Sequence, residues 1–159
     1  MVFGVRAEKD KINIVILEGS KSDPSYKDVK RLQIIITSPK VADSRGEELN
    51  SMKKEFEELL KKFQPAIVAL KDAENSQHSK VTSNILRGEV EGMLILTCYE
   101  NDIEIKRLLY TTIKGLVPID GKLRSKEFLY TGLSNRFGDL KLGDKHKDAL
   151  LSAWAVLDE

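Results

Sequence analysis

The first third of the chain alternates between short runs of β-branched residues and polar turns. The runs VFGV (2–5), INIVILEG (12–19) and RLQIIITS (31–38) have the length and composition of β-strands. The polar stretch RAEKDK separates the first two runs, and a loop-like stretch rich in Ser and Asp, with Gly and Pro, precedes the third. Such short connections favour antiparallel neighbours, so we expect a three-stranded meander at the front of a sheet.

The rest of the chain alternates between helical periodicity and short apolar runs. Apolar residues recur at three- and four-residue spacings in EELNSMKKEFEELLKKF, which predicts an amphipathic helix with a charged outer face. The apolar runs at 66–70 and 103–109 predict two further strands, and strands that alternate with helices pair in parallel. The expected helices span residues 47–63, 81–101, 110–116, 124–137 and 146–157.

These elements predict one α/β domain over residues 1–159. Its mixed five-stranded sheet has three antiparallel strands followed by parallel strands, and helices flank it. The 159 residues are 41% hydrophobic and 32% charged, which is typical of a globular protein. No apolar stretch approaches the roughly 20 residues that cross a bilayer, so we expect no membrane association.

Charge and cysteine content indicate which ligands and which cellular compartment the protein suits. The 26 basic and 25 acidic side chains give a net charge of +1, which argues against a strong nonspecific polyanion binder but leaves room for a local basic face. The lone Cys98 can form no internal disulfide, and its apolar neighbours indicate a buried thiol. We therefore expect a cytoplasmic protein.

Two glycines mark the predicted helix 81–101. Gly88 and Gly92 lie four residues apart on one face, and each costs a helix about 1 kcal/mol relative to Ala. A helix that keeps both indicates close approach by another element or by a second subunit, so a homodimer is expected. Packing within one subunit explains the glycines equally well.

An ordered set of segments resembles the RuvC Holliday-junction resolvases, a branch of the RNase H-like superfamily. The set comprises FGVR in the first strand, QPAIVALKDA in the strand after the first long helix, and TSNILRGEVEGMLILTCYENDIEIKRLLYTTIKGLV, which ends in the Lys114-Gly115 turn. The C-terminal HKDALLSAWAVL matches the ending of that family. The likeness covers most of the chain from Gln64 to Leu157 and the first strand. It implies an RNase H-like fold.

The resemblance also implies a two-metal nuclease site. In that family, acidic or histidine ligands from the first strand, the fourth strand and the last helix hold two divalent ions, which activate water against a phosphodiester. The matching positions here are Arg6, Lys71, Lys145 and Asp148. Three of them are basic, so we expect a degenerate site without a metal cofactor, in which Asp148 pairs with a side-chain cation.

A different ligand set remains open. A shift of one residue would put Asp72 in place of Lys71, and Asp144 or His146 could join Asp148 around Mg²⁺ or Mn²⁺. The carboxylate of the first strand would still be missing. This alternative predicts an active metal-dependent nuclease, selective for nucleic-acid structure, with displaced ligands.

Three functions therefore compete. We favour a catalytically degenerate RuvC-like protein that keeps a nucleic-acid- or partner-binding role, with DNA or RNA as the expected nucleic acid. Its phosphate contacts would come from Arg6, Lys71, Lys114 and Lys145. The alternatives are the active nuclease and a dimeric interaction protein with no nucleic-acid role.

Overall fold

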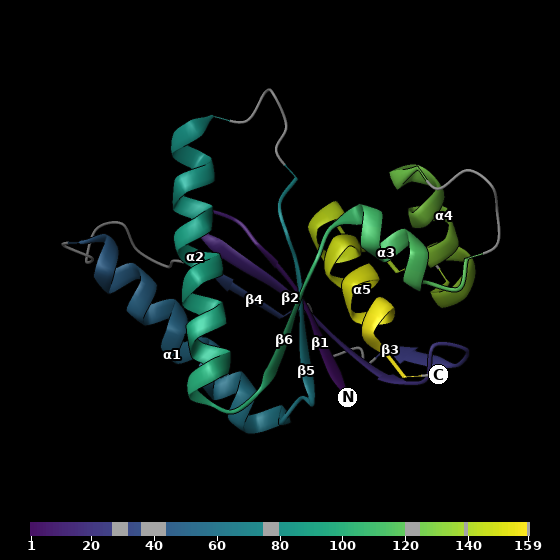
Figure 1. Ribbon diagram of the computed structural model, residues 1–159, viewed down its shortest axis with the longest axis horizontal. Coiled ribbons are helices and arrows are strands. Elements are labelled where there is room, and N and C mark those ends of the chain that lie inside the picture. Colours follow the sequence, from purple (N-terminus) through teal and green to yellow (C-terminus); the bar gives the residue numbers. More distant parts are fainter. Residues whose placement is uncertain (27–31, 36–43, 75–79, 120–124, 139, 159) are drawn as a thin grey trace.

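A computed structural model of the chain describes residues 1–26, 32–35, 44–74, 80–119, 125–138 and 140–158. The elements in these ranges are β1 (Val2–Ala7), β2 (Lys11–Gly19), β3 (Pro24–Tyr26), β4 (Leu32–Ile35), α1 (Arg45–Phe63), β5 (Ile67–Lys71), α2 (Val81–Glu100), β6 (Glu104–Leu108), α3 (Tyr110–Leu116), α4 (Lys126–Phe137) and α5 (Asp144–Val156). Figure 1 shows α1 and α2 on one side of the sheet and α5, with α3 and α4 beyond it, on the other.

The strands form one mixed sheet in the order β3-β2-β1-β5-β6, and β4 also pairs with β2. β2 pairs antiparallel with β1, β3 and β4, whereas β1–β5 and β5–β6 are parallel. This is the predicted mixed α/β architecture, with antiparallel strands followed by parallel ones. Residues 31 and 36–38 of the third predicted strand and residue 124 of the predicted fourth helix lie outside the described residues.

The sheet contains one strand more than expected. β3 occupies Pro24–Tyr26, inside the stretch predicted to be a loop, and pairs with the end of β2 from Leu17 to Gly19. Three residues that include a proline show no alternation of apolar and polar positions, so hydrophobic periodicity does not detect this strand.

The first helix begins and ends where local chemistry requires. The hydroxyl of Ser44, the N-cap, accepts a hydrogen bond from the backbone N–H of Glu47, and Gln64 takes a left-handed conformation at the C-terminal end. Pro65 follows and has no N–H to continue the helix. The chain therefore turns directly into β5, one of the strands that position the candidate site.

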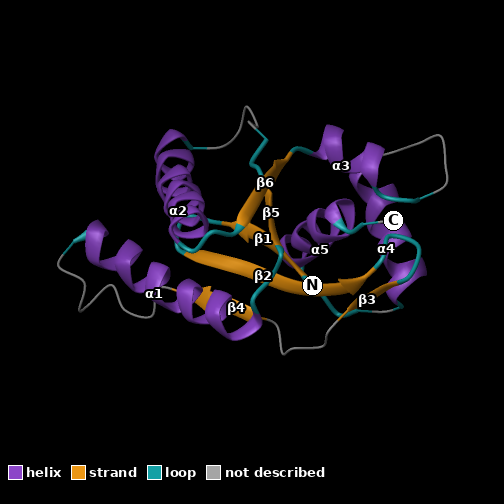
Figure 2. Ribbon diagram, turned by 60° about the horizontal axis from the view of Figure 1, so that its bottom comes forward, coloured by secondary structure: helices purple, strands orange, loops and turns teal. Residues whose placement is uncertain are grey.

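The sheet separates two apolar cores, and Figure 2 shows helices on both of its faces. Phe3, Val5 and Ala7 of β1 point into the core under α1 and α2, whereas Val2 belongs to the core under α5. Because side chains alternate along a strand, Gly4 and Arg6 also face α5. A buried arginine therefore stands on the apolar face that receives the last helix.

The last helix touches the sheet at Gly4. A Cβ atom at this position would lie 1.9 Å from the carbonyl oxygen of Ala149 and 2.9 Å from the Cβ of Ala153, so only glycine allows α5 to approach β1 this closely. This contact places Asp148, the neighbour of Ala149, beside the end of β1.

Two other expectations concern α2 and the membrane. Cys98 is fully buried in α2, and burial raises the pKa of its thiol to about 12. Within the described residues, none of the helices combines the length and the apolar character that a bilayer crossing requires.

Candidate functional site

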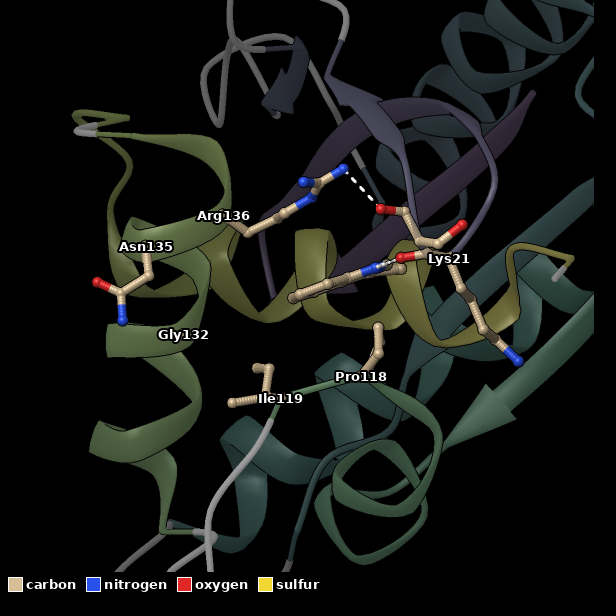
Figure 3. A pocket seen from close by; sticks show the side chains of 8 residues that line it. Lys21, Pro118, Ile119, Gly132, Asn135 and Arg136 are labelled. Carbon is tan, nitrogen blue, oxygen red and sulfur yellow. Dashed lines mark hydrogen bonds between the residues drawn. The ribbon is translucent and has the colours of Figure 1, made fainter.

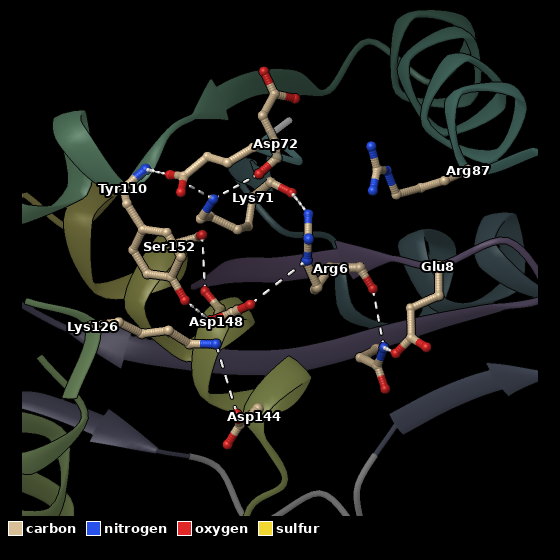
Figure 4. Close-up of polar contacts among 12 residues, drawn as sticks. Arg6, Glu8, Lys71, Asp72, Arg87, Tyr110, Lys126, Asp144, Asp148 and Ser152 are labelled. Atoms are coloured by element: carbon tan, nitrogen blue, oxygen red, sulfur yellow. Dashed lines mark hydrogen bonds and ion pairs between the residues drawn. The ribbon is translucent and has the colours of Figure 1, made fainter. Parts of the chain in front are cut away.

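Side chains from β1, β5 and α5 meet where the two parallel strands end (Figure 4). Arg6, Lys71 and Asp148 are only 8%, 1% and 3% exposed, so three charged residues are buried together. They occupy three of the four positions matched to the resolvase ligands. The fourth, Lys145, lies exposed in the first turn of α5 and does not join this buried cluster.

Arg6 links β5 to α5. Its Nη1 atom donates a hydrogen bond to the backbone carbonyl of Lys71 at 2.9 Å, and its Nε atom lies 3.7 Å from Oδ2 of Asp148. Within the described residues, Nε is buried without a hydrogen-bond partner, so its contact with Asp148 is an ion pair. Such a pair depends on both partners, because losing either one leaves a buried charge uncompensated.

Asp148 also accepts two phenolic hydrogen bonds. The hydroxyls of Tyr110 in α3 and Tyr130 in α4 both donate to its Oδ1 atom, the second at 2.5 Å. Burial, together with the hydrogen bond to Asp148, raises the pKa of both phenols, which therefore remain protonated donors. One carboxylate oxygen thus holds α3 and α4 against α5, and the other faces Arg6.

Sequence analysis did not identify these two tyrosines. Tyr110 follows β6, and Tyr130 stands in the middle of α4, with no spacing that connects either one to Asp148. The only available signal was the polar tip of an aromatic side chain, which usually finds a hydrogen-bond partner when buried.

Lys71 is packed beneath Tyr110. Its Nζ atom donates a 2.6 Å hydrogen bond to the backbone carbonyl of Asp72, lies 3.4 Å from Oε1 of Glu74, and lies 4.1 Å from the centroid of the Tyr110 ring. Burial lowers the pKa of the ammonium group and nearby Arg6 lowers it further, while Glu74 and Asp148 oppose both effects. The lysine thus occupies space near Asp148, the one carboxylate among the three buried charged side chains of this cluster.

The arrangement does not fit a divalent cation. Mg²⁺ and Mn²⁺ require several oxygen ligands, but Asp148 is the one carboxylate among the three buried charged side chains of this cluster. In the described part of the chain, no three His, Cys, Asp or Glu side chains are grouped so that they could hold a metal.

The four residues of the alternative ligand set also lie in separate environments. Asp72 pairs with Arg107 at 3.0 Å, and Asp144 is 65% exposed and lies 3.7 Å from Nζ of Lys126. His146 is buried in the first turns of α5. With Asp148 bound to two tyrosines, these four residues do not form a ligand cluster in the part of the chain that the structure describes.

Lysine side chains surround Tyr130 on the outer side of the buried cluster. The Nζ atoms of Lys126 and Lys147 lie 5.2 and 5.1 Å from its ring centroid, and exposed Lys145 lies between Asp144 and His146. We call Lys126, Lys145 and Lys147 the lysine rim. Lys114, also expected to contact phosphate, is half-buried in α3.

The comparisons with known proteins rest on structure. The sequence matches no protein-family model and no curated protein. The structure of Thermus thermophilus RuvC in complex with a Holliday junction substrate matches with a TM-score of 0.76 at 15% identity, over 97% of this chain and 90% of that one. A second T. thermophilus RuvC structure matches with a TM-score of 0.74 at 18% identity, over 97% of this chain and 91% of that one. The yeast mitochondrial Holliday junction resolvase Ydc2 matches with a TM-score of 0.58 at 12% identity, over 97% of this chain and 77% of that one.

These likenesses confirm the predicted fold. The chain has the mixed α/β, RNase H-like fold of RuvC and of other Holliday junction resolvases, along nearly its whole length.

The buried ion pair gives a direct stability prediction. Asp148→Asn keeps the volume and an acceptor for the tyrosines but removes the charge opposite Arg6, so the free energy of unfolding should fall by about 3–5 kcal/mol. Urea unfolding followed by circular dichroism measures the change. Asp144→Asn, on the same helix but exposed, should shift it by no more than about 0.5 kcal/mol. Equal free energies of unfolding for Asp148→Asn and the wild type would show that Arg6 and Asp148 do not interact as two buried charges.

Proposed function

We propose that the protein is a catalytically degenerate nucleic-acid-binding protein built on the resolvase fold. The observation behind this proposal is the surroundings of Asp148, whose carboxylate pairs with an arginine and accepts hydrogen bonds from two phenols. In a two-metal nuclease the equivalent carboxylates must be free to bind cations that activate water. Here Arg6 and Lys71 supply the positive charge that such cations would bring.

The lysine rim supports a nucleic-acid role. Arg6 and Lys71 are buried, so direct phosphate contacts fall to exposed lysines beside them, while the two buried cations add positive potential. Lys145 is the exposed member of the matched positions, and the Nζ atoms of exposed Lys126 and half-buried Lys147 lie beside the ring of Tyr130. DNA is the favoured ligand because a T. thermophilus RuvC structure of the same fold contains a Holliday junction substrate. The proposed place of action is the cytoplasm, in keeping with a single, buried cysteine.

This proposal predicts binding of a four-way DNA junction in EDTA, without cleavage in Mg²⁺ or Mn²⁺. Contacts between lysines and phosphates release counterions, so affinity should fall steeply with salt. Lys145→Ala should weaken binding and reduce the slope of log K against log salt by about 1. Fluorescence anisotropy at several salt concentrations measures both quantities, and a gel assay measures cleavage.

Lys54→Ala is the matched control, because Lys54 is an exposed lysine on α1, across the sheet from the site. It should bind the junction like the wild type. Metal-dependent cleavage would favour the active nuclease. Absence of any junction binding would favour the interaction protein without a nucleic-acid role.

We also propose that the protein forms a homodimer through α2. An exposed stripe runs along this helix at spacings of four and three residues, and it consists of Val81, Ile85, Gly88, Gly92, Leu96 and Tyr99. Its four large apolar side chains are 52–80% exposed. Among the described residues, no atom would lie within 4 Å of a Cβ atom added at either glycine, so packing against these residues does not account for the glycines. Exposed apolar surface on this scale marks an interaction site.

The stripe matches itself in an antiparallel arrangement. About a twofold axis near Val90, Gly88 would face Gly92 of the partner subunit, and Val81 would face Tyr99 of the partner subunit. Two glycines at the crossing point allow the helix backbones to approach closely. At the ends, exposed Lys80 would face Glu100 of the partner subunit; within one chain, Glu100 also pairs with Lys53 at 2.6 Å.

The dimer is testable by placing a charge on the stripe. Leu96→Glu should convert the protein from a dimer into a monomer, because a carboxylate cannot be buried without a partner in a self-complementary apolar contact. Light scattering coupled to size exclusion reports the mass. Lys54→Glu on α1 should leave the mass of the wild type unchanged. A wild type with the mass of one chain at about 100 μM would contradict the dimer, since Kd would then exceed that concentration.

A further inference from the structure

A cleft of about 510 Å³ lies at the far end of α5 from Asp148 (Figure 3). Its lining comes from the turn after β2, the segment after α3, the C-terminal half of α4 and one residue of α5: Lys21, Ser22, Pro118, Ile119, Gly132, Asn135, Arg136 and Trp154. Trp154 stands six residues after Asp148, or about 9 Å along the helix axis. The volume falls in the range of small-molecule sites.

Hydrogen bonds hold the walls of this cleft in place. The indole Nε1 of Trp154 donates to the backbone carbonyl of Lys21 at 2.9 Å, and the ring of Phe137 packs against the indole with its centroid 5.4 Å away. Arg136 donates to the carbonyl of Ser22 at 2.8 Å and to Oδ1 of Asp23 at 2.9 Å. The turn after β2 is therefore tied to both α4 and α5, and the cleft between them is preorganised.

One wall of the cleft is apolar and closely packed. A Cβ atom at Gly132 would lie 2.6 Å from Cδ1 of Ile119, so the α4 backbone rests directly on that side chain. Pro118 precedes Ile119 along the same wall. Such a surface suits the face of a flat, apolar ring.

The charged groups that line the cleft, among the described residues, are both cations. Lys21 and Arg136 line it, and no carboxylate from the described part of the chain does, although Asp23 pairs with Arg136 from outside. Lys21 makes no ion pair with the described residues, and it also lines a second cleft of about 300 Å³, whose other charged residues are Lys106 and Asp158 in the described part of the chain. In Figure 3 its side chain extends away from Arg136. An anionic group bound at Lys21 would lie between the two hollows.

We propose that this cleft binds a nucleoside monophosphate. The planar base packs against Pro118 and Ile119, and the phosphate pairs with Lys21. The same chemistry occurs in a free nucleotide and in the 5′-terminal nucleotide of a strand. The site is separate from Asp148 and from the lysine rim, so its test does not depend on the function proposed above.

Trp154, the only tryptophan of the chain, reports on binding because it lines the cleft. Titration of the full-length protein with AMP should change its fluorescence in a saturable way, with Kd below about 1 mM. Adenosine, which lacks the anion, and inorganic phosphate, which lacks the ring, should each bind more weakly. Lys21→Ala should weaken AMP binding about tenfold, as loss of one charge-assisted hydrogen bond does.

Lys21→Ala should fold normally, because the bonds to Trp154 and Asp158 use the backbone of Lys21, which the substitution keeps. Lys54→Ala should bind AMP like the wild type. A 5′-phosphorylated trinucleotide that binds more tightly than AMP would assign the site to strand ends, and equal affinity would assign it to free nucleotides. No saturable response to AMP at about 1 mM, or the same affinity in Lys21→Ala and wild type, would overturn the proposal. Loss of junction binding in Lys145→Ala would not affect this result.

Discussion

The close packing of α5 on β1 is the contact on which the candidate site depends. Gly4 leaves room for the carbonyl of Ala149 directly over the strand, where any side chain would collide with it. Two residues further along the same face of β1 stands Arg6, and one residue before Ala149 stands Asp148. The approach of helix to strand therefore fixes the distance between a buried cation and a buried anion.

The second constraint is electrostatic. Two buried cations and one buried carboxylate share the end of the parallel strands, and a buried charge is tolerated only when it is paired or hydrogen-bonded. Arg6 pairs with Asp148, Lys71 rests on Tyr110 and the backbone of Asp72, and two phenols complete the shell of the carboxylate. Each of the three charged side chains therefore has at least one polar partner among the described residues, although Nε of Arg6 makes no hydrogen bond there. The cluster braces α3 and α4 against α5, while Lys126 and Lys145 of the lysine rim are exposed.

The sequence was sufficient to predict much of this arrangement. The alternation of strand and helix patterns predicted the mixed sheet, and the positions matched to the resolvases pointed to Arg6, Lys71 and Asp148, which the structure brings together. Tyr110 and Tyr130 could not be predicted, because the direction of a side chain on α3 or α4 depends on how the helix is rotated against α5. The nearly complete burial of Lys71 could not be predicted either, because a lysine at the end of a strand is ordinarily exposed.

We propose that side-chain cations take the place of metal ions around Asp148. Calorimetric titration with Mn²⁺ of the wild type and of the double variant Arg6→Asp/Lys71→Glu tests this replacement. We expect no binding to the wild type and measurable binding to the double variant, because the substitutions place two oxygen ligands beside Asp148. Adding Asp148→Asn to the double variant should weaken that binding. Mn²⁺ binding by the wild type that disappears in Asp148→Asn alone would instead show that Asp148 is a metal ligand beside Arg6 and Lys71.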